Sequence, residues 1–443
     1  MKITRSIFYP QAFMLIASIG ATIAIAATEA AISFEDRLVW NDYSYGFGVQ
    51  AADLDGDGFV DLITADTSGF IQAELFSDDK LGTLPVDAGV RRPAISGGPA
   101  IENSNVYWFR NDGKGNFERR FIARNDLGRR LERHVIADLN KDGRPDIIMV
   151  DNFLADIVWF ENPGTMALAR GDLWEKRFIA RGTMFGSVDV TVADFDGDGN
   201  LDVAGAGWRL GNCFKWFKNP GNPSVQDWEG CVIDSGFPGA SCVVAGDVDG
   251  DGRVDLLGTS RDSRVLMWYE CPVRPSSQPW QRHVIETTPQ PEPCFAKLVD
   301  MNRDGKLDVV LAWGGYLTPA LGKERLGSVV WYENAGKREG RVQWRKHIIS
   351  HELPGAVDVT LADFNGDGWV DVAAVGWMPG EVAWFENNHD PAARWTKHSV
   401  KLNYPNANQI VAADFDGDGR PDLAAIADYG AMELRWWRNE LKP

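Results

Sequence analysis

The chain has 443 residues, of which 44% are hydrophobic and 24% are charged, a composition typical of a folded globular protein. Its formal net charge of −18 argues against nucleic acid as a partner, because binding to phosphates requires a basic surface. The 46 Gly, 22 Pro and 18 Trp predict many short strands joined by tight turns.

Residues 1–26 have the pattern of a signal peptide. Lys2 and Arg5 precede an apolar run from Ala12 to Ala26, which ends in a small-x-small cleavage motif. The run is too short for an ordinary membrane span, and no later segment has the pattern of one. We therefore expect an exported protein, secreted, periplasmic or on the cell surface, with no transmembrane segment after cleavage. An uncleaved N-terminal anchor is the alternative.

From residue 33 to residue 440 the chain consists of a repeat. A nine-residue motif, Asp-x-Asp/Asn-x-Asp-Gly-x-x-Asp, occurs seven times between two apolar, β-rich stretches. A third stretch carries a Trp followed by an aromatic residue, with Asn three positions after the Trp in six repeats and Cys271 in the fourth. A fourth stretch reads aromatic-x-x-x-x-Ile/Val. Four short strands repeated seven times predict an all-β, seven-bladed propeller with four-stranded blades.

The two ends of the repeat complement each other. The last repeat stops after its third strand, residues 434–439, and a stretch with the pattern of a fourth strand occurs at residues 34–39. We expect this N-terminal strand to complete the last blade and to close the ring, which removes two exposed sheet edges. We expect the repeated Trp side chains to fill the space between blades.

The five cysteines leave the disulfide pattern open. Export permits disulfides, but an odd number leaves at least one thiol unpaired within a monomer. Cys213 with Cys231, and Cys242 with Cys294, are the two pairings that the predicted strands bring near each other.

The acidic motif has the oxygen-rich composition of a calcium loop. Positions 1, 3 and 5 supply side-chain oxygens, position 7 a backbone carbonyl and position 9 a carboxylate, while Gly at position 6 permits the sharp turn. An EF-hand does not fit, because it needs an acid at position 12 and helices on both sides. We predict up to seven structural Ca²⁺ ions, and we set aside the alternative that these carboxylates are catalytic pairs. The predicted ligands are Asp53, Asp55, Asp57, Phe59, Asp61, Asp138, Asn140, Asp142, Arg144, Asp146, Asp194, Asp196, Asp198, Asn200, Asp202, Asp247, Asp249, Asp251, Arg253, Asp255, Asp300, Asn302, Asp304, Lys306, Asp308, Asp363, Asn365, Asp367, Trp369, Asp371, Asp414, Asp416, Asp418, Arg420 and Asp422.

Three loops carry Asn140, Asn302 or Asn365 at position 3 and so contain three carboxylates instead of four. We expect these loops to bind the ion more weakly, because less negative charge offsets it.

These loops, the Trp-Phe-x-Asn strand and the Trp-x-x-His-x-Ile strand of residues 280–285 resemble the FG-GAP/VCBS repeats. Such repeats form the propeller heads of integrin α-subunits and many secreted bacterial proteins, and the resemblance covers about residues 34–439. It implies that each loop joins the first and second strands of a blade and that its calcium is structural. Functions in the family include adhesion, lectin-like binding and enzymes of the polysaccharide lyase and aldos-2-ulose dehydratase types. No motif specific to these enzymes is evident, and fold alone does not determine function.

The face opposite the loops differs between repeats and is the expected ligand face. Two long connections lie on it, about residues 66–104 and 314–328. Aromatic rings beside polar donors suit sugar binding, whereas packing at the top of the ring is the alternative interpretation. The candidate ligand-binding residues are Trp208, Arg209, Trp313, Trp377, Lys323 and Tyr429.

The leading hypothesis is an exported, calcium-stabilised binding module for a glycan or an extracellular protein. One alternative is a carbohydrate-active propeller enzyme of the lyase or dehydratase type, in which His134, expected near the central opening, or Tyr316 acts as the base. The other alternative is a cell-surface or matrix adhesion protein without a small ligand.

Overall fold

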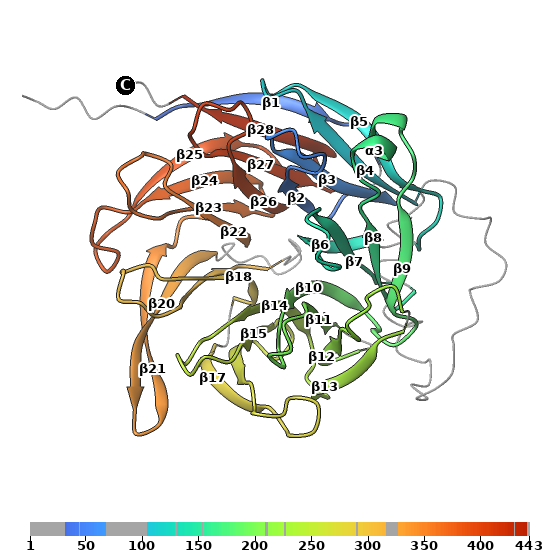
Figure 1. The fold of residues 1–443 in the computed structure, drawn as a ribbon. Coiled ribbons are helices and arrows are strands. Elements are labelled where there is room, and N and C mark those ends of the chain that lie inside the picture. Colours follow the sequence, from blue (N-terminus) through green and yellow to red (C-terminus); the bar gives the residue numbers. More distant parts are fainter. Residues whose placement is uncertain are drawn as a thin grey trace, which may run out of the picture.

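The structure, a computed structural model, describes residues 32–43, 45–67, 104–128, 131–152, 154–208, 211–225, 227–288, 291–315, 327–428 and 430–440. Within these residues the chain forms strands β1 to β28 and one short helix, α3 (Thr165–Arg170). The strands make seven four-stranded antiparallel sheets, which are arranged in a ring (Figure 1). The predicted seven-bladed β-propeller is therefore confirmed. The expected signal peptide, residues 1–26, lies outside the described residues.

Each blade is numbered here in chain order, with its innermost strand first. Blade 1 consists of β2 (Val49–Ala52), β3 (Asp61–Thr67), β4 (Ser104–Asn111) and β5 (Phe117–Arg124), and blade 2 of β6 (Leu131–Ala137), β7 (Asp146–Asp151), β8 (Asp156–Glu161) and β9 (Glu175–Ala180). Blade 3 consists of β10 (Ser187–Ala193), β11 (Asp202–Gly207), β12 (Cys213–Lys218) and β13 (Glu229–Ser235), and blade 4 of β14 (Ala240–Gly246), β15 (Asp255–Ser260), β16 (Val265–Glu270) and β17 (Gln281–Thr287). Blade 5 consists of β18 (Pro293–Val299), β19 (Asp308–Trp313), β20 (Ser328–Arg338) and β21 (Arg341–Ser350), and blade 6 of β22 (Ala356–Ala362), β23 (Asp371–Gly376), β24 (Glu381–Glu386) and β25 (Thr396–Leu402). Blade 7 consists of β26 (Ala407–Ala413), β27 (Asp422–Ala427), β28 (Glu433–Asn439) and β1 (Phe34–Trp40).

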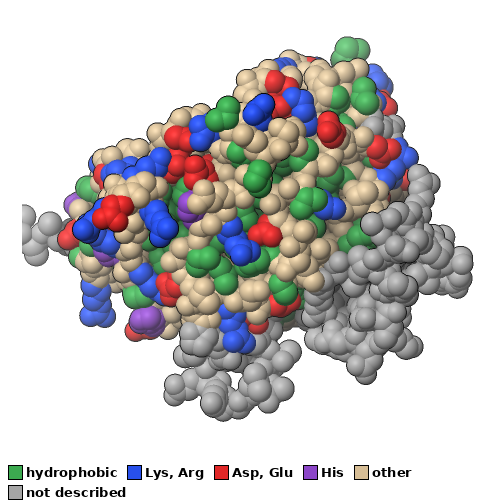
Figure 2. Space-filling view, turned by 90° about the horizontal axis from the view of Figure 1, so that it is seen from below, with side chains coloured by type: hydrophobic (Ala, Val, Ile, Leu, Met, Phe, Trp, Pro, Cys, Tyr) green, Lys and Arg blue, Asp and Glu red, His purple; other side chains and the backbone are tan. Residues whose placement is uncertain are grey.

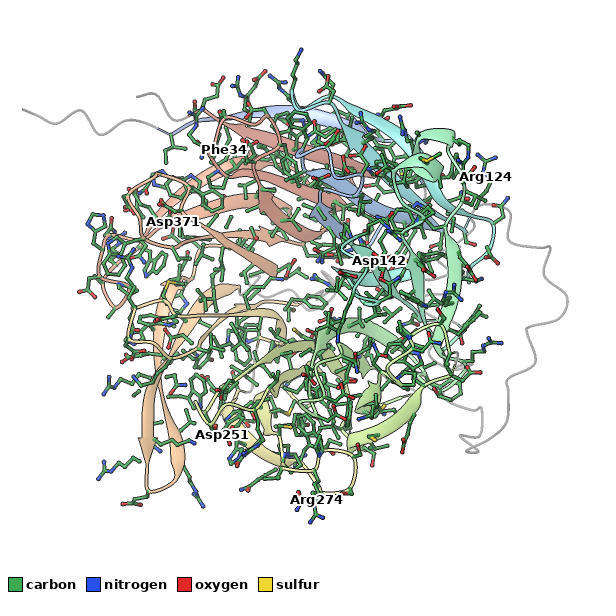
Figure 3. The ribbon with its side chains drawn as sticks, in the orientation of Figure 1. Phe34, Arg124, Asp142, Asp251, Arg274 and Asp371 are labelled. Carbon is green, nitrogen blue, oxygen red and sulfur yellow. The ribbon has the colours of Figure 1, made fainter. Side chains whose placement is uncertain are left out.

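The last blade closes the ring with the N-terminal strand. Strand β1 pairs antiparallel with β28, with Phe34 opposite Asn439 and Trp40 opposite Leu434. Figure 3 shows Phe34 on this outer strand, beside the blades built from the C-terminal end of the chain. The innermost strands contact each other in a closed order, in which β26 of blade 7 contacts β2 of blade 1. The expected closing strand is confirmed.

The repeated Trp side chains of the third strands fill the space between blades, as expected. All seven are at most 2% exposed: Trp108, Trp159, Trp216, Trp268, Trp331, Trp384 and Trp436. In three blades the indole stacks on a histidine of the fourth strand; Trp268 and His283, for example, have ring centroids 4.3 Å apart and an interplanar angle of 15°. Aromatic area buried in this way stabilises neighbouring sheets against each other.

The outermost strands are exposed edges, and two features protect them from pairing with other chains. The register shifts at least once between the third and fourth strands of every blade, and twice in blade 5, and such bulges distort the edge. Figure 2 shows Lys and Arg side chains interspersed with Asp and Glu over one side of the molecule. All five cysteine thiols are free, so the structure contains neither of the two pairings considered from the sequence.

Candidate metal loops and ligand face

Each acidic loop joins the first and second strands of a blade, as the resemblance implied. In the third loop, Asp194 Oδ2 accepts a hydrogen bond of 2.8 Å from Gly199 N, and Asp194 Oδ1 accepts one of 3.0 Å from Asp198 N. The bond from position 6 to position 1 recurs in all seven loops at 2.7 to 2.9 Å. The loops therefore share one conformation around their first aspartate.

The glycine at position 6 is required by this conformation. Its φ lies between 82° and 88° in all seven loops, a left-handed region that residues with a Cβ rarely adopt. The sharp turn expected from the sequence is therefore present in each blade. Figure 3 labels loop residues of three different blades, Asp142, Asp251 and Asp371.

In four loops, three carboxylates lie close enough to share one cation. Their ligand oxygens are within 4.8 Å of one another. The groups are Asp53, Asp55 and Asp57; Asp194, Asp196 and Asp202; Asp247, Asp249 and Asp251; and Asp414, Asp416 and Asp422. These are the four loops with Asp at position 3, and within the described residues the three loops with Asn contain no such group.

Position 9 has a structural role that was not anticipated from the sequence. Asp202 is fully buried; its Oδ2 accepts a hydrogen bond of 3.1 Å from Phe195 N and its Oδ1 one of 2.7 Å from Asn219 N. The same two bonds occur in every blade. The aspartate thus links its own loop to the third strand as well as offering oxygens to an ion.

Burial and charge make these aspartates receptive to a cation. Burial, together with the neighbouring Asp196 and Asp198 carboxylates, raises the pKa of Asp202 to about 7. In the last loop the Asp416 side chain is 8% exposed, and its Oδ1 has no hydrogen-bond partner among the described residues. A buried carboxylate oxygen without a partner is costly, and a hard divalent cation takes oxygen ligands of this kind. The residues present therefore fit such an ion.

The recurring asparagine of the third strand connects neighbouring blades. Asn162 Nδ2 donates a hydrogen bond of 2.9 Å to Leu54 O, at position 2 of the preceding loop. Corresponding bonds to the preceding blade occur at Asn111, Asn334 and Asn439, and Cys271 Sγ takes this place at 3.4 Å from Phe195 O. The recurring asparagine is visible in the sequence. The carbonyl that accepts its hydrogen bond lies in another repeat, so the sequence alone does not identify it.

His134, a candidate catalytic base, does not face the central opening. It is 2% exposed and lies between blades 1 and 2, with Nε2 3.2 Å from Ile63 O on β3. Burial lowers its pKa to about 4. Successive side chains of a strand alternate in direction, so that Arg133 takes the position toward the axis. The other candidate base, Tyr316, lies outside the described residues.

Two of the three tryptophans proposed for the ligand face belong to the core. Trp313 is 2% exposed, and its Nε1 donates a hydrogen bond of 3.1 Å to Tyr332 Oη. Trp377 is 8% exposed and packs in the same hydrophobic cluster. For these two residues the structure favours the packing interpretation. Arg209, Lys323 and Tyr429 lie outside the described residues.

Trp208 differs, because it is only partly buried at the end of β11. The guanidinium carbon of Arg261 lies 5.0 Å from the centroid of its ring, and Arg261 Nε is 3.3 Å from Glu292 Oε2. Three separate segments of the chain thus place an indole, a guanidinium and a carboxylate together, at the end of the blades opposite the acidic loops.

The family model described as FG-GAP-like repeat matches residues 97–149, 138–205, 194–258, 300–374 and 363–425, together more than half of the chain. The protein belongs to the FG-GAP repeat family. Four of the matches begin at the first aspartate of an acidic loop and extend through the next loop, so the repeat unit of this FG-GAP propeller includes the connection between blades. No curated protein matches the chain. The described residues of the FG-GAP propeller include no helix with the length and apolar character of a membrane span.

Proposed function

We propose that this FG-GAP propeller is an exported, calcium-stabilised module that binds a glycan through the face opposite its acidic loops. An extracellular protein is the alternative ligand. The proposal of export rests on the charge, apolar run and cleavage motif of residues 1–26.

The proposal of calcium rests on the donor set of the loops. Positions 1, 3, 5 and 9 would hold the ion, and the ion would supply positive charge between clustered carboxylates. Because position 9 is also hydrogen-bonded to the third strand, an ion bound there would hold the loop onto two strands of its blade. An ion that binds the folded protein and not the unfolded chain stabilises the fold by mass action.

The observation that carries the ligand proposal is the Trp208 site. An indole face offers a flat apolar surface to the C–H face of a sugar ring, and the Arg261 and Glu292 side chains supply a donor and an acceptor for hydroxyl groups. Arg261 and Glu292 hold each other in place, so the polar groups are positioned before a ligand arrives.

The test is to incubate the mature, calcium-loaded protein, residues 27–443, with a panel of immobilised polysaccharides, scoring both retention and released products. Retention that is lost in Trp208→Ala and kept in Trp344→Ala would support the site, because Trp344 is a partly buried indole of outer strand β21. Unsaturated or shortened products would indicate an enzyme instead. Absence of retention on every polysaccharide would contradict the glycan proposal and favour a protein ligand.

A further inference from the structure

On the third strand, one residue directly precedes the recurring Asn or Cys271. In six of the seven blades, the charge of this residue depends on whether position 3 of the acidic loop is Asp or Asn. Where position 3 is Asp55, Asp196 or Asp416, the third-strand residue is basic: Arg110, Lys218 or Arg438. Where position 3 is Asn140, Asn302 or Asn365, it is acidic: Glu161, Glu333 or Glu386. Blade 4 departs from this rule, since both Asp249 and Glu270 are acidic.

The basic residues reach the carboxylates of their own loops. Arg110 Nε lies 2.6 Å from Asp55 Oδ2, and Lys218 forms an ion pair with Asp196. Arg438 pairs with Asp416 in the same way. The three position-3 side chains are only 8 to 12% exposed. A carboxylate so far removed from water needs a nearby positive charge or another strong partner.

In blade 4 the cation that pairs with Asp249 comes from blade 5. Lys337 Nζ lies 2.8 Å from Asp249 Oδ2, and the Asp249 side chain is 5% exposed. Lys337 is near the end of β20, which has 11 residues, whereas the other third strands have 6 to 8. The extension of this strand is what carries an ammonium group to the loop of blade 4.

Two of the three loops with Asn at position 3 show the converse arrangement. Asn140 Nδ2 donates a hydrogen bond of 3.2 Å to Glu161 Oε1, and Asn365 Nδ2 donates one of 3.3 Å to Glu386 Oε1. A neutral amide needs no counter-ion and is satisfied by a carboxylate acceptor. The cation therefore accompanies the position-3 carboxylate, and the four loops that have one are the four in which three carboxylates cluster.

We propose that Arg110, Lys218, Lys337 and Arg438 are built-in counter-ions of these four loops. Each neutralises the position-3 carboxylate while no divalent ion is bound, and each competes with the ion for that carboxylate. The inference rests on the proposed calcium binding. With such a counter-ion, the calcium affinity of a loop is lower than its four carboxylates alone imply. The counter-ion also keeps the loop in its shape when no metal is bound.

Lys337 offers the sharpest test, because it lies in a different blade from the loop it neutralises. In Lys337→Met, one bound calcium ion should shift to about tenfold lower free calcium, since a repelling charge is removed. Lys337→Arg keeps the charge and should bind like the parent. Equilibrium dialysis measures the binding, and calorimetry with excess chelator should show a lower melting temperature for Lys337→Met alone. The matched control is Arg341→Met, an exposed cation of the same hairpin without an ion pair to a described acidic loop.

Equal calcium binding by Lys337→Met and Lys337→Arg, or weaker binding by Lys337→Met, would overturn the inference. Arg110→Met against Arg110→Lys repeats the comparison in blade 1, so that misfolding of one variant does not decide the outcome. The parent protein separates the two proposals. If the parent neither binds calcium nor melts higher with it, the calcium assignment itself fails; if the parent responds and the paired variants do not differ, only the counter-ion role fails.

Discussion

Arg133 on β6 forms a salt bridge of 3.2 Å with Asp358 on β22, which joins blades 2 and 6 across the axis of the ring. Both side chains are buried, at 3% and 0% exposed. The same guanidinium donates a hydrogen bond of 3.0 Å to Asn408 O of blade 7, and its central carbon lies 3.2 Å from the ring centroid of Phe295 of blade 5. One side chain thus contacts three blades that are not its neighbours in sequence.

Removal of Arg133 alone should destabilise the whole ring. In Arg133→Met the Asp358 carboxylate stays buried without its counter-charge, and we expect the free energy of unfolding to fall by about 3–5 kcal/mol. The double variant Arg133→Met/Asp358→Asn should lose less than the sum of the single variants, because it removes the Asp358 charge together with its partner. Denaturant titration measures all three. A loss of under about 1 kcal/mol in Arg133→Met would contradict this account.

Deletion of residues 33–40 should lower the melting temperature of the entire propeller. The deletion removes β1, exposes the edge of β28 and opens the ring, and an open apolar edge also favours aggregation. Leu38→Ser is the control, since it changes an exposed side chain of the same strand and keeps the strand. A truncated protein that melts like the parent would show that β1 is dispensable for closure.

The third-strand asparagine that links neighbouring blades should stabilise the fold more than Cys271, which takes its place in blade 4. Asn162→Ala leaves the buried Leu54 carbonyl without its donor, which should cost about 1–3 kcal/mol. Cys271→Asn replaces a weak Sγ donor with an amide and should gain up to about 1 kcal/mol. Thermal unfolding of both variants tests the pair. A destabilised Cys271→Asn would mean that blade 4 has no room for the amide.

His134 should make stability depend on pH below neutrality. Its pKa is lowered to about 4 by burial, from 6.5 in the unfolded chain. Above pH 6.5 it is neutral in both states and contributes nothing. As pH falls from 6.5 to 4, only the unfolded chain takes up the proton, so about 3 kcal/mol of stability is lost. In His134→Gln this part of the loss should disappear. If the difference in unfolding free energy between parent and variant is constant from pH 7 to 4, His134 does not titrate in this way.

Several features follow from the sequence because their physical causes are local. Asp194 and Gly199 lie in one turn of the chain, so the loop and its glycine can be recognised without knowledge of any other blade. The strand periodicity, the number of blades and the closing strand follow from counting repeats. The burial of the third-strand Trp side chains follows in the same way, because stacked sheets need large apolar side chains between them.

Other features depend on the direction in which the side chains of a strand point, and on which blades pack against each other. A shift of one residue reverses the direction of a side chain, which is why His134 lies between blades and Arg133 at the axis. The burial of Trp313 and the reach of Lys337 to Asp249 likewise depend on how blade 5 packs against its neighbours. The sequence by itself therefore determined the repeat, the fold and the acidic loops, which are local patterns. Only the tertiary structure decided the partners of Arg133, Lys337 and the third-strand asparagines, because closure of the ring brings together residues that no local pattern connects.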